Sequence, residues 1–276
     1  MIVWPIIFLL FSLVMVVSLV LAFRSMSDYQ ERPLSLGLPY ALYLVQKPEG
    51  LTTEIINRIH EGCLLDRLII SLERLFRGER TALVIFGPTK ILRPLSEDLG
   101  LLEIEDYSLK VDGEFSAWEM GIKKEPESFL SLESFLKTIP ALLEKEQIWW
   151  QLVLQPIPKI EASKTFTGKV GQFFDTIFNG TFKKRLGIGS GQETFRTALR
   201  VFVSAQDKKK VAELEEEVLK IGKEAGLVKL PQAYSSEQML KFYQEKVMPK
   251  IHLGTESAHG VPLIFEDKEI KSLLGL

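Results

Sequence analysis

The sequence contains a single cysteine, Cys63, and only three histidines. One cysteine cannot close an intrachain disulfide, so a disulfide framework is excluded. His60 and Cys63 share one face of a predicted helix without a further ligand, and a structural metal site needs three or four. His252 and His259 flank a segment that has no carboxylate pattern. We therefore predict no metal and no other cofactor.

The chain also lacks an excess of charge of one sign. It has 34 basic and 36 acidic residues, which gives a formal net charge of -2. Such a balance creates no overall field that would recruit nucleic acid. All of this charge follows Phe23, and the residues after it are numerous enough to bury the core of one or two domains.

Nucleotide-binding and catalytic motifs are missing as well. Gly87 and Lys90 lack the second glycine with which a P-loop cradles phosphate. The glycine-rich residues 187–191 precede a predicted strand instead of joining a strand to a helix, so they indicate a loop and not a dinucleotide site. Glu103 and Glu105 lie two apart on a predicted strand. Paired carboxylates can do acid–base chemistry if burial separates their pKa values, but a solvent-facing strand edge is the simpler interpretation.

The first 23 residues carry the clearest positive signal. Residues 2–23 contain no charged side chain, and as a helix they would extend roughly 33 Å, enough to cross a hydrocarbon core of about 30 Å. A cleaved signal peptide is the alternative, with residues 20–22 as its cleavage site. However, no basic residue precedes the apolar run, and the run is longer than a signal peptide needs. We predict a transmembrane anchor that stays uncleaved. Because Arg24 and Arg32 follow it, the positive-inside rule places the bulk of the chain in the cytoplasm.

The rest of the sequence alternates short apolar runs with longer amphipathic ones. Strands are predicted at residues 41–46, 81–87, 101–107, 115–123, 147–155 and 195–205, and helices at 52–77 (ended by Gly78), 132–145, 166–179 and 207–225. A further helix and an edge strand are predicted in the C-terminal tail. This mixture predicts an α/β (α+β) sandwich, with helices on one face of a largely antiparallel sheet and two ferredoxin-like halves. The predicted organisation is an anchor at 1–23, a juxtamembrane linker at 24–39, a first α/β unit at 40–112 and a second α/β unit with a C-terminal helix extension at 113–276.

The strand-like stretch EQIWWQLVLQPIP, residues 146–158, contains two adjacent tryptophans. Alternation places Trp150 on an apolar face and Trp149 on a half-polar face beside Gln151. Pro156 and Pro158 should end the ladder, because proline cannot donate a backbone hydrogen bond. A core strand with Trp149 packed under a helix is the simpler interpretation. The alternative is an exposed surface for a partner.

That alternative surface would include Trp149 and Gln151, and we add the basic run Lys183, Lys184 and Arg185 to it. The basic run lies beside the predicted loop at 187–191 and is suited to weak binding of an anion or a lipid headgroup. Stacking of Trp149 on nucleic-acid bases would in addition require a basic groove around it. The sequence shows no such groove.

Three segments carry a resemblance to known proteins: LLEIEDY at 101–107, EQIWWQLVLQPIP at 146–158 and TALRVFVSA at 197–205. In this order they resemble an uncharacterised α/β domain at the front of membrane-anchored, type IV secretion-like conjugative transfer proteins of candidate-phylum bacteria. The likeness covers residues 40–205. It implies a transmembrane helix that leads into this domain, often followed in those proteins by a hexameric DNA-translocating ATPase.

The present chain departs from that pattern because it reaches Leu276 without a motor motif. The resemblance therefore carries over no catalytic residue. It implies a single-pass, non-enzymatic scaffold or docking component whose partners are the lipid bilayer and a protein such as a secretion or conjugation ATPase. The alternative is a membrane-attached enzyme whose site is assembled from dispersed Glu, His and Ser residues that no motif reveals.

Overall fold

A computed structural model describes residues 12, 14–16, 18, 38–109, 111, 113–122, 142–157, 194–224, 227–231, 234–246, 248, 263–266, 270–271 and 274. The predicted helix at 166–179, most of the one at 132–145, and Lys183, Lys184 and Arg185 lie outside these residues. So does most of the predicted anchor, of which positions 12, 14–16 and 18 are described and helical. Within the described part of the chain, no helix is both long enough and apolar enough to cross a membrane.

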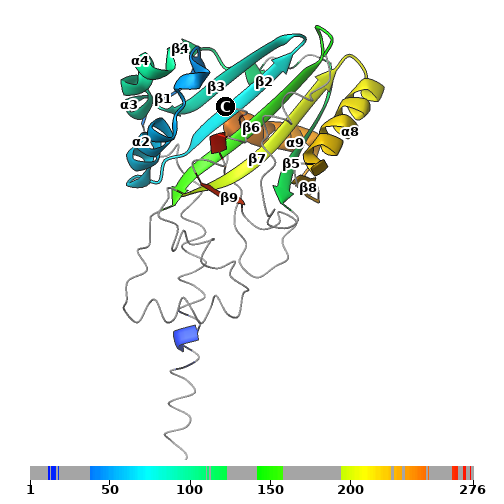
Figure 1. Cartoon of the computed structure of the whole chain (residues 1–276). Helices are drawn as coiled ribbons and strands as arrows, with labels where there is room; N and C mark the ends of the chain where they lie inside the picture. The colour runs from blue at the N-terminus through cyan, green and yellow to red at the C-terminus, as the bar shows by residue number, and fades with distance from the viewer. Residues whose placement is uncertain are drawn as a thin grey trace, which may run out of the picture.

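The fold is α+β and is built on one large antiparallel sheet (Figure 1). Its strands in the described residues are β1 (Tyr40–Val45), β2 (Ile70–Arg77), β3 (Arg80–Pro88), β4 (Leu101–Ile104), β5 (Glu114–Ile122), β6 (Gln147–Ile157), β7 (Thr194–Ala205), β8 (Leu227–Lys229) and β9 (Leu263–Glu266). The sheet runs in the order β4-β1-β3-β2-β6-β7-β5-β8, and β9 pairs with one end of β7. The strands predicted at 41–46, 81–87, 115–123, 147–155 and 195–205 are confirmed to within a few residues. The run predicted at 101–107 is a strand only over β4.

The strand order repeats itself. From its outer edge inward, the first half reads β4-β1-β3-β2 and the second reads β8-β5-β7-β6. In each half, the first strand along the chain lies between the fourth and the third. The two halves join where β2 pairs with β6, from Ile70 opposite Leu154 to Arg77 opposite Gln147. The predicted units at 40–112 and 113–276 thus contribute to one continuous sheet.

Helices cover both faces of the sheet. The helices are α2 (Thr53–Leu64), the short α3 (Thr89–Leu92) and α4 (Ser96–Leu99), α8 (Lys208–Glu224) and α9 (Ser236–Glu245). The apolar sides of α2 and α8 share the main core with the face of β6 that carries Trp150. Met239 and Tyr243 of α9 pack on the opposite face, and Figure 1 shows α9 behind the strands when α2 and α8 are in front. The prediction that helices lie on one face only was therefore wrong.

The predicted helix at 52–77 was also wrong in its second half. α2 begins at Thr53 and ends at Leu64, and the side chain of its N-cap residue Thr52 accepts from Ile55 N. Arg67 has a φ of 51°, which breaks the helix, and the next residues form β2. Gly78, with a φ of 55°, turns the chain from β2 into β3 and does not end a helix. The misreading has a physical cause: β2 is buried on both faces, so its apolar residues do not alternate and imitate a helical spacing.

Two smaller predictions near β6 were also incorrect. Residues 142–146 form a turn, not the end of a helix. Pro156 does not end the ladder, because β6 continues to Ile157 and Pro156 lies opposite Phe195. Pro158 lies outside the described residues. The predicted helix at 207–225 is confirmed as α8, and the C-terminal helix and strand are confirmed as α9 and β9.

Candidate functional site

A row of polar residues crosses the sheet on the face that α9 covers. Glu73 of β2 lies opposite Gln151 of β6, which lies opposite Arg200 of β7, which lies opposite Glu119 of β5. Directly paired residues of adjacent strands have Cβ atoms about 5 Å apart. The four side chains therefore touch in sequence, and all four are buried.

Apolar residues flank the polar row on both sides. One neighbouring row consists of Leu75, Trp149, Phe202 and Ala117, and the other contains Val153 and Ala198. The ring of Trp149 stacks on Phe202 with a centroid distance of 4.1 Å. These residues exclude water from the row, so each of its polar groups must find a partner within the protein.

The sheet holds α9 largely through the end of this helix. Ser235 and Gln238 form a capping box at its start. At its end, Arg200 Nη1 donates to the carbonyl oxygen of Phe242 at 3.0 Å, and Gln151 Nε2 donates to that of Tyr243 at 2.9 Å. The backbone N–H of Lys246 also donates to both carbonyls. Carbonyls in the last turn of a helix lack their usual partners four residues on and carry a partial negative charge, so they can accept these further donors. The polar row therefore acts as a C-terminal cap built on the sheet.

Glu73, at the β2 end of the row, accepts hydrogen bonds from several donors. Its Oε1 accepts from Ser71 Oγ at 2.6 Å and from Gln151 Nε2 at 2.9 Å, and Lys246 Nζ lies 4.0 Å away. Its Oε2 accepts from the hydroxyl of Tyr107. With this many donors, a buried carboxylate is compatible with the apolar rows beside it.

A chain of hydroxyl groups leads to Glu73. The Tyr107 hydroxyl lies 2.8 Å from that of Tyr243. Since Tyr107 gives its single proton to Glu73, Tyr243 must donate to Tyr107. Burial, followed by the charge of Glu73, raises the pKa of both tyrosines well above the ordinary 10.0.

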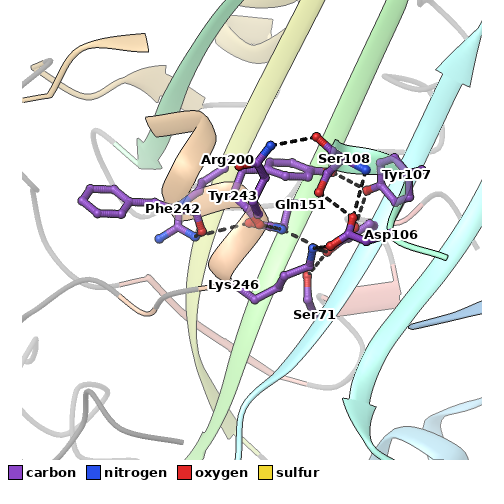
Figure 2. A network of polar contacts seen from close by, with 11 residues as sticks. Ser71, Asp106, Tyr107, Ser108, Gln151, Arg200, Phe242, Tyr243 and Lys246 are labelled. Carbon is purple, nitrogen blue, oxygen red and sulfur yellow. Dashed lines mark hydrogen bonds and ion pairs between the residues drawn. The ribbon is translucent and has the colours of Figure 1, made fainter. Parts of the chain in front are cut away.

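Lys246, which follows α9, and the segment from Asp106 to Ser108 lie along one side of the site (Figure 2). Lys246 ends the helix with a φ of 52°. Its Nζ lies 3.5 Å from Asp106 Oδ2, and Asp106 Oδ1 accepts from the backbone N–H of Ser108 at 2.9 Å. Gln244 Nε2 donates to the carbonyl of Ser108 at 2.8 Å. The segment that carries Tyr107 is thus fixed to both α9 and the sheet.

The raised pKa values lead to a first prediction. Unfolding exposes Tyr107 and Tyr243 and returns their pKa to about 10. Their contribution to stability is therefore fully present below pH 10 and is lost as the pH rises from 10 towards the folded-state values. Each tyrosine should lower the free energy of unfolding by about 1.4 kcal/mol per pH unit in that range. Urea unfolding between pH 9 and pH 11 should show this slope. Burial also raises the pKa of Tyr40 and of Cys63 to about 12, so these two groups add a slope of their own. The double variant Tyr107→Phe/Tyr243→Phe should lose the part of the slope that Tyr107 and Tyr243 cause, whereas Tyr234→Phe should keep the whole slope.

No protein-family model matches this chain, and no curated protein matches it either. Function is therefore inferred from the chemistry of the site and from the resemblance of the three sequence segments.

The structure buries two of the predicted partner-surface residues. Trp149 is 3% exposed and Gln151 is 0% exposed. Trp149 lies edge-on to Tyr107 and contacts Tyr243 of α9, as in the interpretation that packs it under a helix. The alternative prediction, in which Trp149 is exposed on a surface for a partner, was wrong. The prediction of an exposed face failed because glutamine is usually exposed to solvent. The side-chain amide of Gln151 is instead buried and donates to the last turn of α9.

The requirement for base stacking is not met among the described residues either. Around Trp149 the polar face carries the cations Arg200 and Lys246 and the carboxylates Glu73, Glu119 and Asp106. The carboxylates outnumber the cations and engage both of them. These largely buried and mutually paired charges do not form the basic groove that binding of a phosphate backbone requires.

The other candidate residues lie apart from this site. Glu103 and Glu105 are exposed, one on the edge strand β4 and the other just after it. His60 is buried, with Nε2 3.0 Å from the carbonyl of Thr194 and its ring edge-on to Phe195. Cys63 is buried in the main core, where burial raises its pKa to about 12. No group of potential metal ligands forms within the described residues.

The segment around Gly87 and Lys90, which lacks the second glycine of a P-loop, packs as an ordinary strand and helix. Gly87 lies in β3, where an added Cβ would come within 3.1 Å of Leu92. Lys90 lies in α3, where it pairs with Asp66 at 2.8 Å. Both residues are accounted for without a phosphate.

The residues of the polar row were missed by sequence reasoning. Glu73, Arg200 and Glu119 each interrupt a strongly apolar strand: SLERLF, TALRVFV and SAWEM. A charge within a buried strand must be paired. Arg200 and Glu119 are the single charges of their segments, whereas Glu73 is followed by Arg74. This signal was available for each residue, but it did not identify the partners.

Proposed function

We propose that this protein is a single-pass, membrane-anchored docking component whose folded domain recruits a partner protein at the bilayer and catalyses no reaction. Residues 2–23 provide the anchor, and the bulk of the chain lies in the cytoplasm. At the described positions of this segment the chain is helical and the side chains of Val14, Met15 and Val16 are exposed, as suits a helix that contacts lipid. Tethering raises the local concentration of the partner at the membrane.

The observation that best supports a non-catalytic role is the way in which the polar row is used. Arg200 bonds to Glu119, Gln151 and the carbonyl of Phe242. Glu73 and Gln151 bond to each other and to groups that hold α9 in place. These are the bonds of a structural network that fixes a helix on a sheet, with its polar groups turned towards one another.

We further propose that the partner belongs to a type IV secretion-like or conjugative transfer apparatus. Only the resemblance of residues 101–107, 146–158 and 197–205 supports this part of the proposal. A motor ATPase is the partner that the resemblance favours.

The two halves of the sheet are best interpreted as ferredoxin-like units. Three features support this: the repeated strand order, the antiparallel pairing, and the position of α2 between β1 and β2 and of α8 between β7 and β8. The two units are joined edge to edge where β2 pairs with β6, so they share one continuous sheet.

A purification experiment tests the docking function. Full-length protein is crosslinked mildly in native membranes, purified, and the co-purifying chains are identified by mass spectrometry. We expect recovery of a motor ATPase or of other secretion components. Deletion of residues 2–23 should release the protein from membranes on an alkaline wash and lower partner recovery about tenfold or more, because the tether is lost. Recovery of the protein alone, under conditions that preserve other membrane complexes, contradicts the docking function.

A membrane-attached enzyme is the second candidate, and the hydroxyl chain favours it. Tyr243, Tyr107 and Glu73 form a line of groups that could relay a proton. Substrate would have to reach them beneath α9. Screening of full-length protein against substrate libraries tests this candidate: an activity that Tyr107→Phe abolishes without unfolding the domain would replace the docking proposal.

A further inference from the structure

Among the described residues, the sheet ends in an edge strand, β4, one of whose hydrogen-bonding edges is unpaired. Within the described residues, β4 pairs only with β1, from Leu42 opposite Ile104 to Val45 opposite Leu101. Figure 1 shows β4 at the end of the sheet that lies farthest from α8. An unpaired strand edge presents a row of backbone N–H and C=O groups to which another strand can add.

The register identifies the groups that point outward. Gln46 N donates to Gly100 O at 3.3 Å, next to the last ladder pair of Val45 and Leu101, and the bond from Lys47 N to Leu99 O lies beyond the ladder. Within an antiparallel ladder the hydrogen-bonded pairs alternate. The backbone groups of Leu102 and Ile104 therefore face β1. Those of Leu101 and Glu103 face away from the sheet and have no partner among the described residues.

β4 carries neither lysine nor proline, and the protection of its edge is limited to its length of four residues and to the charge of Glu103. Natural edge strands are protected by lysines, prolines or bulges, and the opposite edge follows that rule: Lys229 of the short β8 pairs with Glu215 and lies over Trp118. In β4, by contrast, Leu102 is 51% exposed. It points to the face that carries α9, as its partner Leu44 does.

Glu103 is the charged side chain of β4 and is exposed on the opposite face. A strand added here would place apolar side chains beside Leu102 and Ile104, and the residue opposite Glu103 would be basic, since opposite charges in a cross-strand pair stabilise a sheet. A second copy of β4 fits poorly. The two-fold arrangement centred on Glu103 brings this carboxylate against its own copy, which destabilises the pair.

We propose that the free edge of β4 is a strand-addition site for an extended segment of another protein in which apolar and basic residues alternate. This inference rests on the proposed docking function and names the surface that performs it. Main-chain bonds from Leu101 and Glu103 provide the affinity, and the carboxylate of Glu103 provides the charge selectivity.

Peptide binding to the full-length protein in mild detergent tests the site. The probe is a fluorescent alternating valine–lysine octapeptide, and its counterpart is an alternating valine–glutamate octapeptide. Three variants are compared with the wild type. Glu103→Gln removes the charge, Glu103→Pro removes the charge and the outward N–H, and Glu61→Gln removes an exposed carboxylate on α2 as a matched control. Proline is tolerated at position 103 because its missing N–H is not one that bonds to β1.

The wild type and Glu61→Gln should bind the lysine peptide about tenfold more tightly than the glutamate peptide. Binding of the lysine peptide should weaken about threefold in Glu103→Gln and about tenfold or more in Glu103→Pro, which also loses a backbone bond. Equal binding by the wild type and Glu103→Pro, with both folded by their thermal midpoints, overturns the proposal. So does absence of binding to the wild type, or a dimer of the wild type that Glu103→Pro dissolves. If the partner recovered from membranes still co-purifies with Glu103→Pro, the docking function stands and only this surface is wrong.

Discussion

Replacing Arg200 with methionine is expected to lower the free energy of unfolding by about 3–5 kcal/mol. Arg200 is 1% exposed, and its Nε lies 3.0 Å from Glu119 Oε1. Burial lowers the pKa of this guanidinium, and the charge of Glu119 opposes the shift. Methionine fills much of the same volume but leaves the carboxylate of Glu119 buried without its cation. It also removes the donor to the last turn of α9.

Urea unfolding of the full-length protein in mild detergent, followed by tryptophan fluorescence, measures this effect. Arg58→Met is the matched control, because Arg58 pairs with Asp98 at 3.2 Å on the surface with both side chains about half exposed. A surface pair of this kind should change stability by about 0–1 kcal/mol. The double variant Arg200→Met/Glu119→Leu should recover part of the loss, since no unpaired buried charge remains. Equal effects of Arg200→Met and Arg58→Met would contradict the buried network.

The sequence predicts well those helices and strands whose apolar residues recur with a single period. In α8, Val211, Leu214 and Val218 recur at helical spacing and are buried, while Glu213 and Glu217 are exposed. The boundaries of this helix follow to within a residue. Here the local pattern and the tertiary environment agree, because one side of the helix contacts the sheet and the other contacts water.

The pattern fails for β2, where the tertiary environment determines the structure. Leu72 contributes to the core under α2 and α8, while Glu73 is equally buried on the α9 face. A strand covered on both faces carries no alternation that reveals it. For the same reason, the sequence of β6 did not indicate that α9 covers Trp149. Gln151 is of a residue type that is usually exposed, but it lies in the core.

The polar row could not be predicted for a different reason. Its members come from strands far apart in the sequence, and Glu73 and Arg200 meet through Gln151 only because β2, β6 and β7 pair in one register. A shift of one residue in either pairing would place an apolar side chain opposite each charge. Charges in buried strands indicate that partners exist. The register that supplies those partners is a property of the whole sheet.

Replacing Trp149 with alanine is expected to lower the free energy of unfolding by about 3–5 kcal/mol, the usual cost of removing a buried tryptophan. The indole fills the space between the sheet and α9, where it stacks on Phe202 and contacts both Tyr107 and Tyr243. The change would leave a cavity beneath α9 and weaken the aromatic contacts that hold the helix.

The expected loss distinguishes a core residue from an interface residue. An exposed tryptophan that served a partner would affect stability by only about 0.5 kcal/mol, which is the change expected for Leu102→Ala on the half-exposed edge strand. Trp149→Phe should cost less than Trp149→Ala, because a phenyl ring keeps the stacking on Phe202 but loses the bond from the indole N–H to Gln147 Oε1. The same urea titration measures all three variants. If Trp149→Ala and Leu102→Ala have equally small effects, Trp149 does not support α9, and the docking surface should then be sought on the face that α9 covers.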